Sequence, residues 1–151
     1  MIRDDIKAAL IGAMKGGDKA ATQTIRLISS AVKNRDIELR TATSTPDDDL
    51  LVTEVMQKMI KQRRESVDMY EKGGRAELAA IETAEIAVIE RFLPAQMSED
   101  EAKAVIAAII AELGAASMKD MGRTMAEVKA RHASSIEPAR ASALVKCALS
   151  T

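Results

Sequence analysis

The sequence predicts an all-α protein, and three observations support this fold class. Apolar residues recur at intervals of three and four along most of the chain, which places them on one face of a helix. The glycine pairs and the three prolines stand at the ends of these periodic segments. Trp is absent, and Tyr and Phe occur once each, so the aromatic residues that strands favour are almost missing.

Four helices are predicted in an N-terminal subdomain, residues 1–94. The glycine pair at residues 16–17 ends the first helix, and Asp18 can cap the second. Thr45 is the expected N-cap of the third, with Pro46 at its first position. The predicted ranges are 2–15, 19–40, 46–72 and 75–93. Short connections between these helices predict a bundle of antiparallel neighbours.

Three further helices are predicted in a small C-terminal subdomain, residues 95–151. Ser98 and Glu101 form the Ser-x-x-Glu pattern of a capping box, and Gly114 ends the helix that follows. Ser117 opens the second helix of this part, which should reach about Arg131. The methionines at 118, 121 and 125 are expected to pack beneath it. The last helix is expected to begin at Pro138.

Charge and composition restrict the function classes. The net charge of −1 gives the whole chain no general attraction to nucleic acid, and DNA is not an expected partner. The apolar run at residues 105–111 is far shorter than the roughly 20 residues of a membrane span. A charged N-terminus does not resemble a signal peptide, and one cysteine cannot form an internal disulfide. We therefore expect a cytoplasmic protein with no membrane contact.

Residues that could support catalysis are sparse. His132 is the single histidine and Cys147 the single cysteine, so neither a catalytic triad nor a soft-metal site can be assembled. We expect His132 to be a solvated loop residue and Cys147 a small core residue. Asp47, Asp48 and Asp49 could suggest a cation site, but consecutive helical residues point about 100° apart and favour a role at the helix dipole. The sequence predicts no enzyme activity, no metal and no cofactor.

The densest basic run lies at residues 58–64, in the third predicted helix. One interpretation is contact with phosphate along that helix. The other, which the spacing favours, is pairing within the helix, because oppositely charged residues stand four apart. The expected pairs are Glu54–Lys58, Lys61–Glu65, Arg64–Asp68 and Asp68–Lys72.

Arg63 and Glu85 each interrupt an apolar stripe. Arg63 falls within the stripe of the third helix, and Glu85 within that of the fourth. Opposite charges on two core-facing stripes predict an ion pair. Because desolvating such a pair is costly, we expect it to fix the helix register rather than to add stability.

The second basic candidate lies in the C-terminal subdomain. Lys119 and Arg123 are four residues apart, and Lys129 and Arg131 follow near His132. With no aromatic residue nearby, base stacking on single-stranded RNA is disfavoured, whereas contact with the backbone of a structured RNA remains open. A solvated basic face without a partner is the equal alternative.

Several segments make the chain similar to the GatB/YqeY family. The resemblance spans nearly the whole chain, and the segments occur in the family's order. They are Lys61-Gln62-Arg63-Arg64-Glu65-Ser66, Tyr70-Glu71-Lys72-Gly73-Gly74-Arg75, Glu85-Ile86, Phe92-Leu93-Pro94-Ala95-Gln96-Met97-Ser98 and Ala115-Ala116-Ser117-Met118-Lys119-Asp120-Met121-Gly122. Before the last helix the family commonly has a Gly-Arg-Ala-Asp-Gly-like turn. Here only Arg131 matches that turn, and residues 134–138 add length.

The resemblance implies an all-helical fold whose C-terminal part is similar to the tail of the GatB subunit of the glutamine-dependent tRNA amidotransferase. In that enzyme the tail helps to hold tRNA, while amidation takes place in other domains. A carbon–nitrogen ligase activity with glutamine as amido donor would therefore be associated with this chain only through the shared domain. Lys119, Arg123, Lys129 and Arg131 are carried over as candidate RNA-contacting residues.

Two functions from different classes follow from the sequence. The first is a non-catalytic module that contacts tRNA or assists a tRNA-dependent amidotransferase. The second is a helical protein-interaction or scaffold module with no RNA role, which could bind a protein of the translation or amidotransferase machinery. Salt separates them, because phosphate contacts weaken steeply with ionic strength and apolar helix packing does not.

Overall fold

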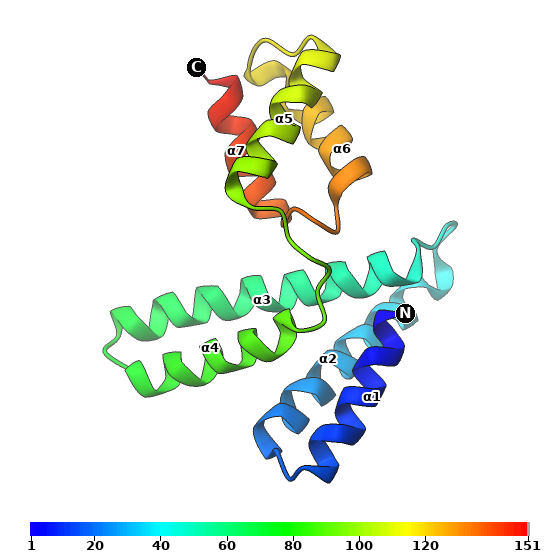
Figure 1. Cartoon of the computed structure of the whole chain (residues 1–151), viewed down its shortest axis with the longest axis vertical. Coiled ribbons are helices and arrows are strands. Elements are labelled where there is room, and N and C mark those ends of the chain that lie inside the picture. The colour runs from blue at the N-terminus through cyan, green and yellow to red at the C-terminus, as the bar shows by residue number, and fades with distance from the viewer. Residues whose placement is uncertain (151) are drawn as a thin grey trace. The chain divides into compact units, whose positions relative to one another are not determined.

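The computed structural model describes residues 1–150, and these residues form helices joined by short loops (Figure 1). No strand occurs among them, which confirms the all-α prediction. The α-helices are α1 (Ile2–Lys15), α2 (Lys19–Glu38), α3 (Asp48–Lys72), α4 (Ala76–Glu90), α5 (Glu99–Leu113), α6 (Met121–His132) and α7 (Pro138–Leu149). Two short 3-10 helices, η1 (Leu39–Thr41) and η2 (Met118–Asp120), follow α2 and precede α6.

The contacts divide the chain into two compact units, Met1–Leu93 and Pro94–Thr151, here named the N-terminal and C-terminal units. The N-terminal unit consists of two helical hairpins, α1 with α2 and α3 with α4 (Figure 1). Helix α2 packs against both helices of the second hairpin, so its buried face is central to the core. The fully buried large residues of this core are Ile25, Ile28, Val52, Met56 and Ile89.

The structure corrects three helix boundaries in the N-terminal unit, namely the start of α3 and the ends of α2 and α4, since α4 ends at Glu90 rather than at residue 93. Helix α3 begins at Asp48, and its N-cap is Asp47, whose carboxylate accepts the N–H of Leu50 at 3.4 Å. The expectation of Thr45 as the cap, with Pro46 already helical, was wrong. Asp47 has the extended backbone of an N-cap, and aspartate is at least as good a cap as threonine. Helix α2 ends earlier than predicted because η1 tightens the chain after Glu38.

In the C-terminal unit, α5, α6 and α7 pack against one another around a separate core. Its buried residues are Ala102, Ile106, Ile109, Val128, Ile136, Ala141, Val145 and Leu149. The predicted capping box is present: Ser98 Oγ accepts the N–H of Glu101 at 3.2 Å, and Glu101 Oε2 accepts the N–H of Ser98 at 2.8 Å. Gly114 ends α5 in the left-handed conformation with φ +62°, which glycine adopts without strain.

Replacing Ser98 by alanine should lower the free energy of unfolding by about 1 kcal/mol, because the N–H of Glu101 loses its acceptor. Urea denaturation followed by circular dichroism would measure this loss. Ser142→Ala is a matched control, since Ser142 lies within α7 and caps no helix. An equal loss in both variants would contradict the capping role.

The segment before α7 closes without the expected glycines. His132 O accepts the N–H groups of Ser135 and Ile136 at 3.1 and 3.0 Å, and Ile136 is only 2% exposed. This turn also holds the start of the unit, because Ser135 O accepts the N–H of Met97 at 2.9 Å. Arg140 Nη1 donates to Met97 O, also at 2.9 Å. The extra residues therefore anchor the segment that precedes α5.

Candidate functional site

The start of α6 positions the first two candidate RNA-contacting residues. Ser117 caps η2 by accepting the N–H of Lys119 at 3.3 Å, and α6 follows directly from η2. Thr124 and Val128 are buried and fix which side of α6 faces the core. Lys119 and Arg123 are both exposed on the remaining surface. The structure therefore leaves these two cations accessible at one end of α6.

Lys119 and Arg123 differ in their local partners. Among residues 1–150, the ammonium of Lys119 makes no ion pair, whereas Arg123 Nε donates to Asp120 Oδ1 at 3.0 Å. Asp120 is also an acceptor for the N–H groups of Ala116 and Ser117, at 2.9 and 3.3 Å. The hydrogen bond from Ala116 is the main cause that holds the pKa of Asp120 below its ordinary value. Asp120 is thus stabilised by the backbone, with or without Arg123.

Arg131 is held more firmly than the other candidates. It donates to Glu112 of α5 at 2.7 Å and to Glu127 of α6 at 2.6 Å. These hydrogen bonds, that to Glu112 first, raise the pKa of the Arg131 guanidinium above its ordinary value. The side chain therefore joins α5 to α6, and a phosphate could bind it only in competition with two carboxylates.

The four candidates do not form one patch. Lys129 and Arg131 are two residues apart in α6, which separates them by about 200° around the helix axis. Arg123 and Arg131 lie within about 80° of each other, but a carboxylate contacts each of them. Of the predicted set, Lys119 and Arg123 remain together as an accessible pair, and Lys129 lies apart from Arg131.

In the N-terminal unit, the structure brings Arg63 and Glu85 together. Arg63 Nε donates to Glu85 Oε2 at 2.8 Å, and Arg63 Nη1 donates to Met59 O at 3.2 Å. The two side chains are only 14% and 22% exposed. This charge-assisted hydrogen bond between two largely buried side chains links α3 to α4 and fixes the position of one helix along the other.

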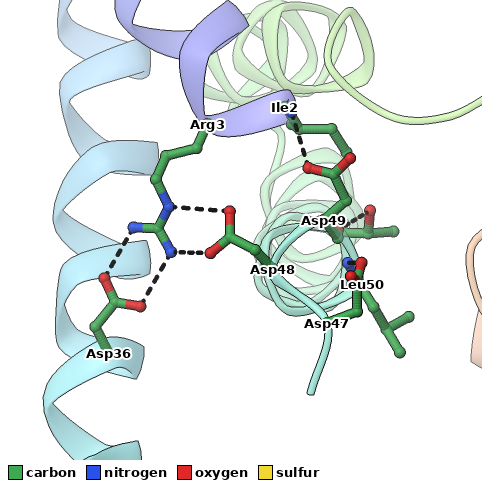
Figure 2. A network of polar contacts seen from close by, with 8 residues as sticks. Ile2, Arg3, Asp36, Asp47, Asp48, Asp49 and Leu50 are labelled. Atoms are coloured by element: carbon green, nitrogen blue, oxygen red, sulfur yellow. Dashed lines mark hydrogen bonds and ion pairs between the residues drawn. The ribbon is translucent and has the colours of Figure 1, made fainter. Parts of the chain in front are cut away.

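Arg3 forms a second, larger network that the sequence did not predict (Figure 2). Its guanidinium donates two hydrogen bonds to Asp36 of α2, at 2.9 and 3.1 Å. It also donates two to Asp48 of α3, at 2.7 and 3.2 Å. Beside it, Asp49 Oδ1 accepts the N–H of Ile2 at 2.9 Å. One side chain of α1 thus connects the first three helices of the unit.

The three consecutive aspartates at the start of α3 take different roles. Asp47 caps α3, Asp48 binds Arg3, and Asp49 accepts the first N–H of α1 (Figure 2). They diverge from one another, as predicted, and no group of three or more potential metal ligands occurs in the described part of the chain. In addition to their favourable position at the dipole of α3, Asp48 and Asp49 hydrogen-bond to residues of α1 and hold that helix against α3.

Other sequence predictions need correction. Cys147 is exposed rather than in the core, because it lies on the outer side of α7 beside the buried Val145 and Leu149. His132 is the last residue of α6 and is half-buried, so it is not a solvated loop residue. Met118 is exposed, whereas Met121 and Met125 pack against the core as expected.

Within α3, only Asp68–Lys72 is an observed ion pair among the four pairs expected there, at 2.6 Å. Arg64 reaches across to Glu90 of α4 instead, at 3.8 Å. In the described residues Lys58 and Lys61 make no ion pair, so their exposed side chains extend into solvent.

Comparison with known proteins now places the chain in a family. The YqeY-like protein family matches residues 3–149, almost the whole length. The chain belongs to the YqeY-like family. This confirms the YqeY-like part of the family resemblance, which rested on the segments around Arg63, Glu85 and Lys119.

Several fungal proteins are similar to this chain. A protein of Eremothecium gossypii named "Altered inheritance of mitochondria protein 41, mitochondrial" is 30% identical over 94 residues, which is 62% of this chain and 48% of the relative. The protein of the same name from Lachancea thermotolerans is 30% identical over 115 residues, covering 74% of this chain and 57% of the relative. An uncharacterised protein of Schizosaccharomyces pombe is 31% identical over 93 residues, or 62% of this chain and 72% of the relative. The matched segment thus spans about half the length of the first two relatives.

Neither the YqeY-like description nor the names of these relatives specifies an enzymatic activity. The names refer to mitochondria, and nothing in them refers to tRNA. Among residues 1–150, no helix has the length and apolar character needed to cross a bilayer.

Proposed function

We propose that this YqeY-like protein is a non-catalytic accessory module whose C-terminal unit contacts the phosphate backbone of a structured RNA, with tRNA as the partner. The accessible pair Lys119 and Arg123 is the observation that carries this proposal. Any amidation would then be the work of a tRNA-dependent amidotransferase that the protein assists. The proposed site of action is the cytoplasm, although the relatives' names point to mitochondria.

Local chemistry favours phosphate contact at this pair over base readout. Lysine and arginine donate hydrogen bonds to phosphate oxygens, and contacts of that kind position a protein on RNA without reading its sequence. The chain's Tyr70 and Phe92 both lie in the N-terminal unit, so the C-terminal unit has no Phe, Tyr or Trp on which a base could stack.

Arg123 can exchange its partner at little cost. Its bond to Asp120 is an exposed ion pair, a class that contributes roughly 0–1 kcal/mol. When Arg123 turns to a phosphate, Asp120 keeps the N–H groups of Ala116 and Ser117. Arg131 lacks this freedom, because its departure would leave Glu112 and Glu127 without their shared cation.

Fluorescence anisotropy with labelled total tRNA tests the proposal. The double variant Lys119→Ala/Arg123→Ala should raise the Kd roughly tenfold at low salt, since two phosphate contacts are lost. Lys146→Ala is the control: it removes an exposed cation of α7, and the Kd should stay within about twofold. Equal weakening by the control would mean a general charge effect, and tRNA binding unchanged in the double variant would contradict the assigned pair.

A protein-interaction module is the second candidate, and one observation favours it. Helix α4 carries exposed apolar residues, among them Ile81, which is 56% exposed. Apolar side chains that a fold leaves exposed together often mark a contact with another protein. If the full-length protein binds no tRNA at low salt, this surface becomes the leading site for a partner.

A further inference from the structure

Helix α4 has an apolar outer face that the N-terminal unit leaves uncovered. Its buried residues Ala79, Val88 and Ile89 pack toward the core, and α4 contacts α3 and α2. The exposed surface of α4 includes residues with small or apolar side chains. They are Ala80, Ile81, Ala84 and Ala87, here named the α4 face. No charged residue lies among these four residues.

Charges of opposite sign stand at the two ends of the α4 face. Glu77 precedes it in the first turn, and Arg91 follows it at the C-cap; both are exposed. Within the part of the chain that the structure describes, Arg91 makes no ion pair, and Glu77 pairs only with its exposed neighbour Arg75, at 2.7 Å. Ala84 lies midway between them, seven residues from each, and the two ends are about 21 Å apart along the axis.

This arrangement is complementary to itself. When two such helices lie antiparallel with their Ala84 residues at the crossing point, each Glu77 meets the Arg91 of the other copy. Ile81 of one copy then packs beside Ala87 of the other. A parallel arrangement would instead place like charges together. Alanines at the centre let two helix backbones approach closely, as ridge-into-groove packing requires.

We propose that two copies of the chain associate through the α4 face, antiparallel and related by a twofold axis near Ala84. A twofold interface uses the same patch on both partners, so one set of residues must supply both the apolar centre and the opposite charges. The proposal is independent of RNA contact by Lys119 and Arg123, which lie in the other unit. A single pair of four-turn helices is a small interface, and we expect dissociation on the order of 10 µM.

Sedimentation equilibrium of the full chain between about 1 and 200 µM tests the proposal, with a reversible monomer–dimer equilibrium as the expected result. Ala84→Arg would place two like charges at the axis and should leave only monomer. Because Ala84 is exposed, the variant should keep the wild-type circular dichroism spectrum. A monomer at every concentration of the wild-type chain would overturn the proposal.

A charge exchange gives the sharper test. Glu77→Arg alone and Arg91→Glu alone each bring like charges together at both ends, and each should weaken the dimer at least several-fold. The double variant Glu77→Arg/Arg91→Glu should restore the wild-type equilibrium. Glu71→Arg, an exposed charge change on α3, is the control and should leave it unchanged. A dimer that Ala84→Arg and the single exchanges do not weaken would show that another surface is used.

Discussion

Replacing Arg63 by methionine should lower the free energy of unfolding by about 3 kcal/mol, because Glu85 would keep its charge without a partner. The cost is not only that of one hydrogen bond. Glu85 lies in the apolar stripe of α4 at 22% exposure, so water replaces the guanidinium poorly. Met59 O would also lose the hydrogen bond that Arg63 donates. Urea denaturation at pH 7 measures the change.

The double variant Arg63→Met/Glu85→Leu should recover most of that loss, to within about 1 kcal/mol of the wild type, because no charge is left at low exposure. Glu85→Leu alone should be costly, since it leaves Arg63 alone. A double-mutant cycle separates the coupling from the individual effects. Additive losses in the two single variants would show that the pair does not act as a unit and would remove its role in setting the register.

Arg3→Gln should destabilise the protein by about 2 kcal/mol at pH 7, because four charge-assisted hydrogen bonds to two carboxylates disappear together. The figure is kept low because Arg3 is 29% exposed and its partners are more accessible. Asp36 and Asp48 would then face each other without the intervening cation. Lys7→Gln is the matched control, one turn further along α1, and should change stability by less than about 0.5 kcal/mol.

The same network predicts a pH dependence. The hydrogen bond from Arg3 is the main cause that lowers the pKa of Asp36 below its ordinary value. A carboxylate whose pKa is lower in the folded state adds stability above its unfolded pKa, near 3.9, and loses it as the pH falls through the folded value. The wild type should therefore lose this stability below about pH 4, and Arg3→Gln should lose less over the same range. Parallel curves for the two proteins would contradict the assignment.

How far the sequence predicts the fold depends on whether the signal is local. The helix containing Ile106 and Ile109 was predicted with both its ends, because its apolar period, its Ser98 cap and Gly114 all act within a few residues. The start of α3 was misplaced because Thr45 and Asp47 are both plausible caps, and only the backbone decides between them. Ile136 was missed as a core residue because it lies in a turn with no helical period.

The same distinction applies to the charged sites. Arg63 and Glu85 could be paired from sequence because each interrupts an apolar stripe, which is unusual enough to require a partner. Arg3 interrupts no stripe, and its partners lie 33 and 45 residues away, so only the crossing of α1, α2 and α3 brings them together. The neutralisation of Arg131 by Glu112 was likewise hidden, because the two residues lie on different helices.

The salt dependence of tRNA binding tests the central proposal most directly. For the wild type, the logarithm of the association constant should fall linearly with the logarithm of salt concentration. In Lys119→Ala/Arg123→Ala the slope should be shallower by about 1.5, since each phosphate contact contributes roughly 0.7–0.9. The same slope in both proteins, or no binding of the folded wild type at low salt, would contradict RNA contact through this pair.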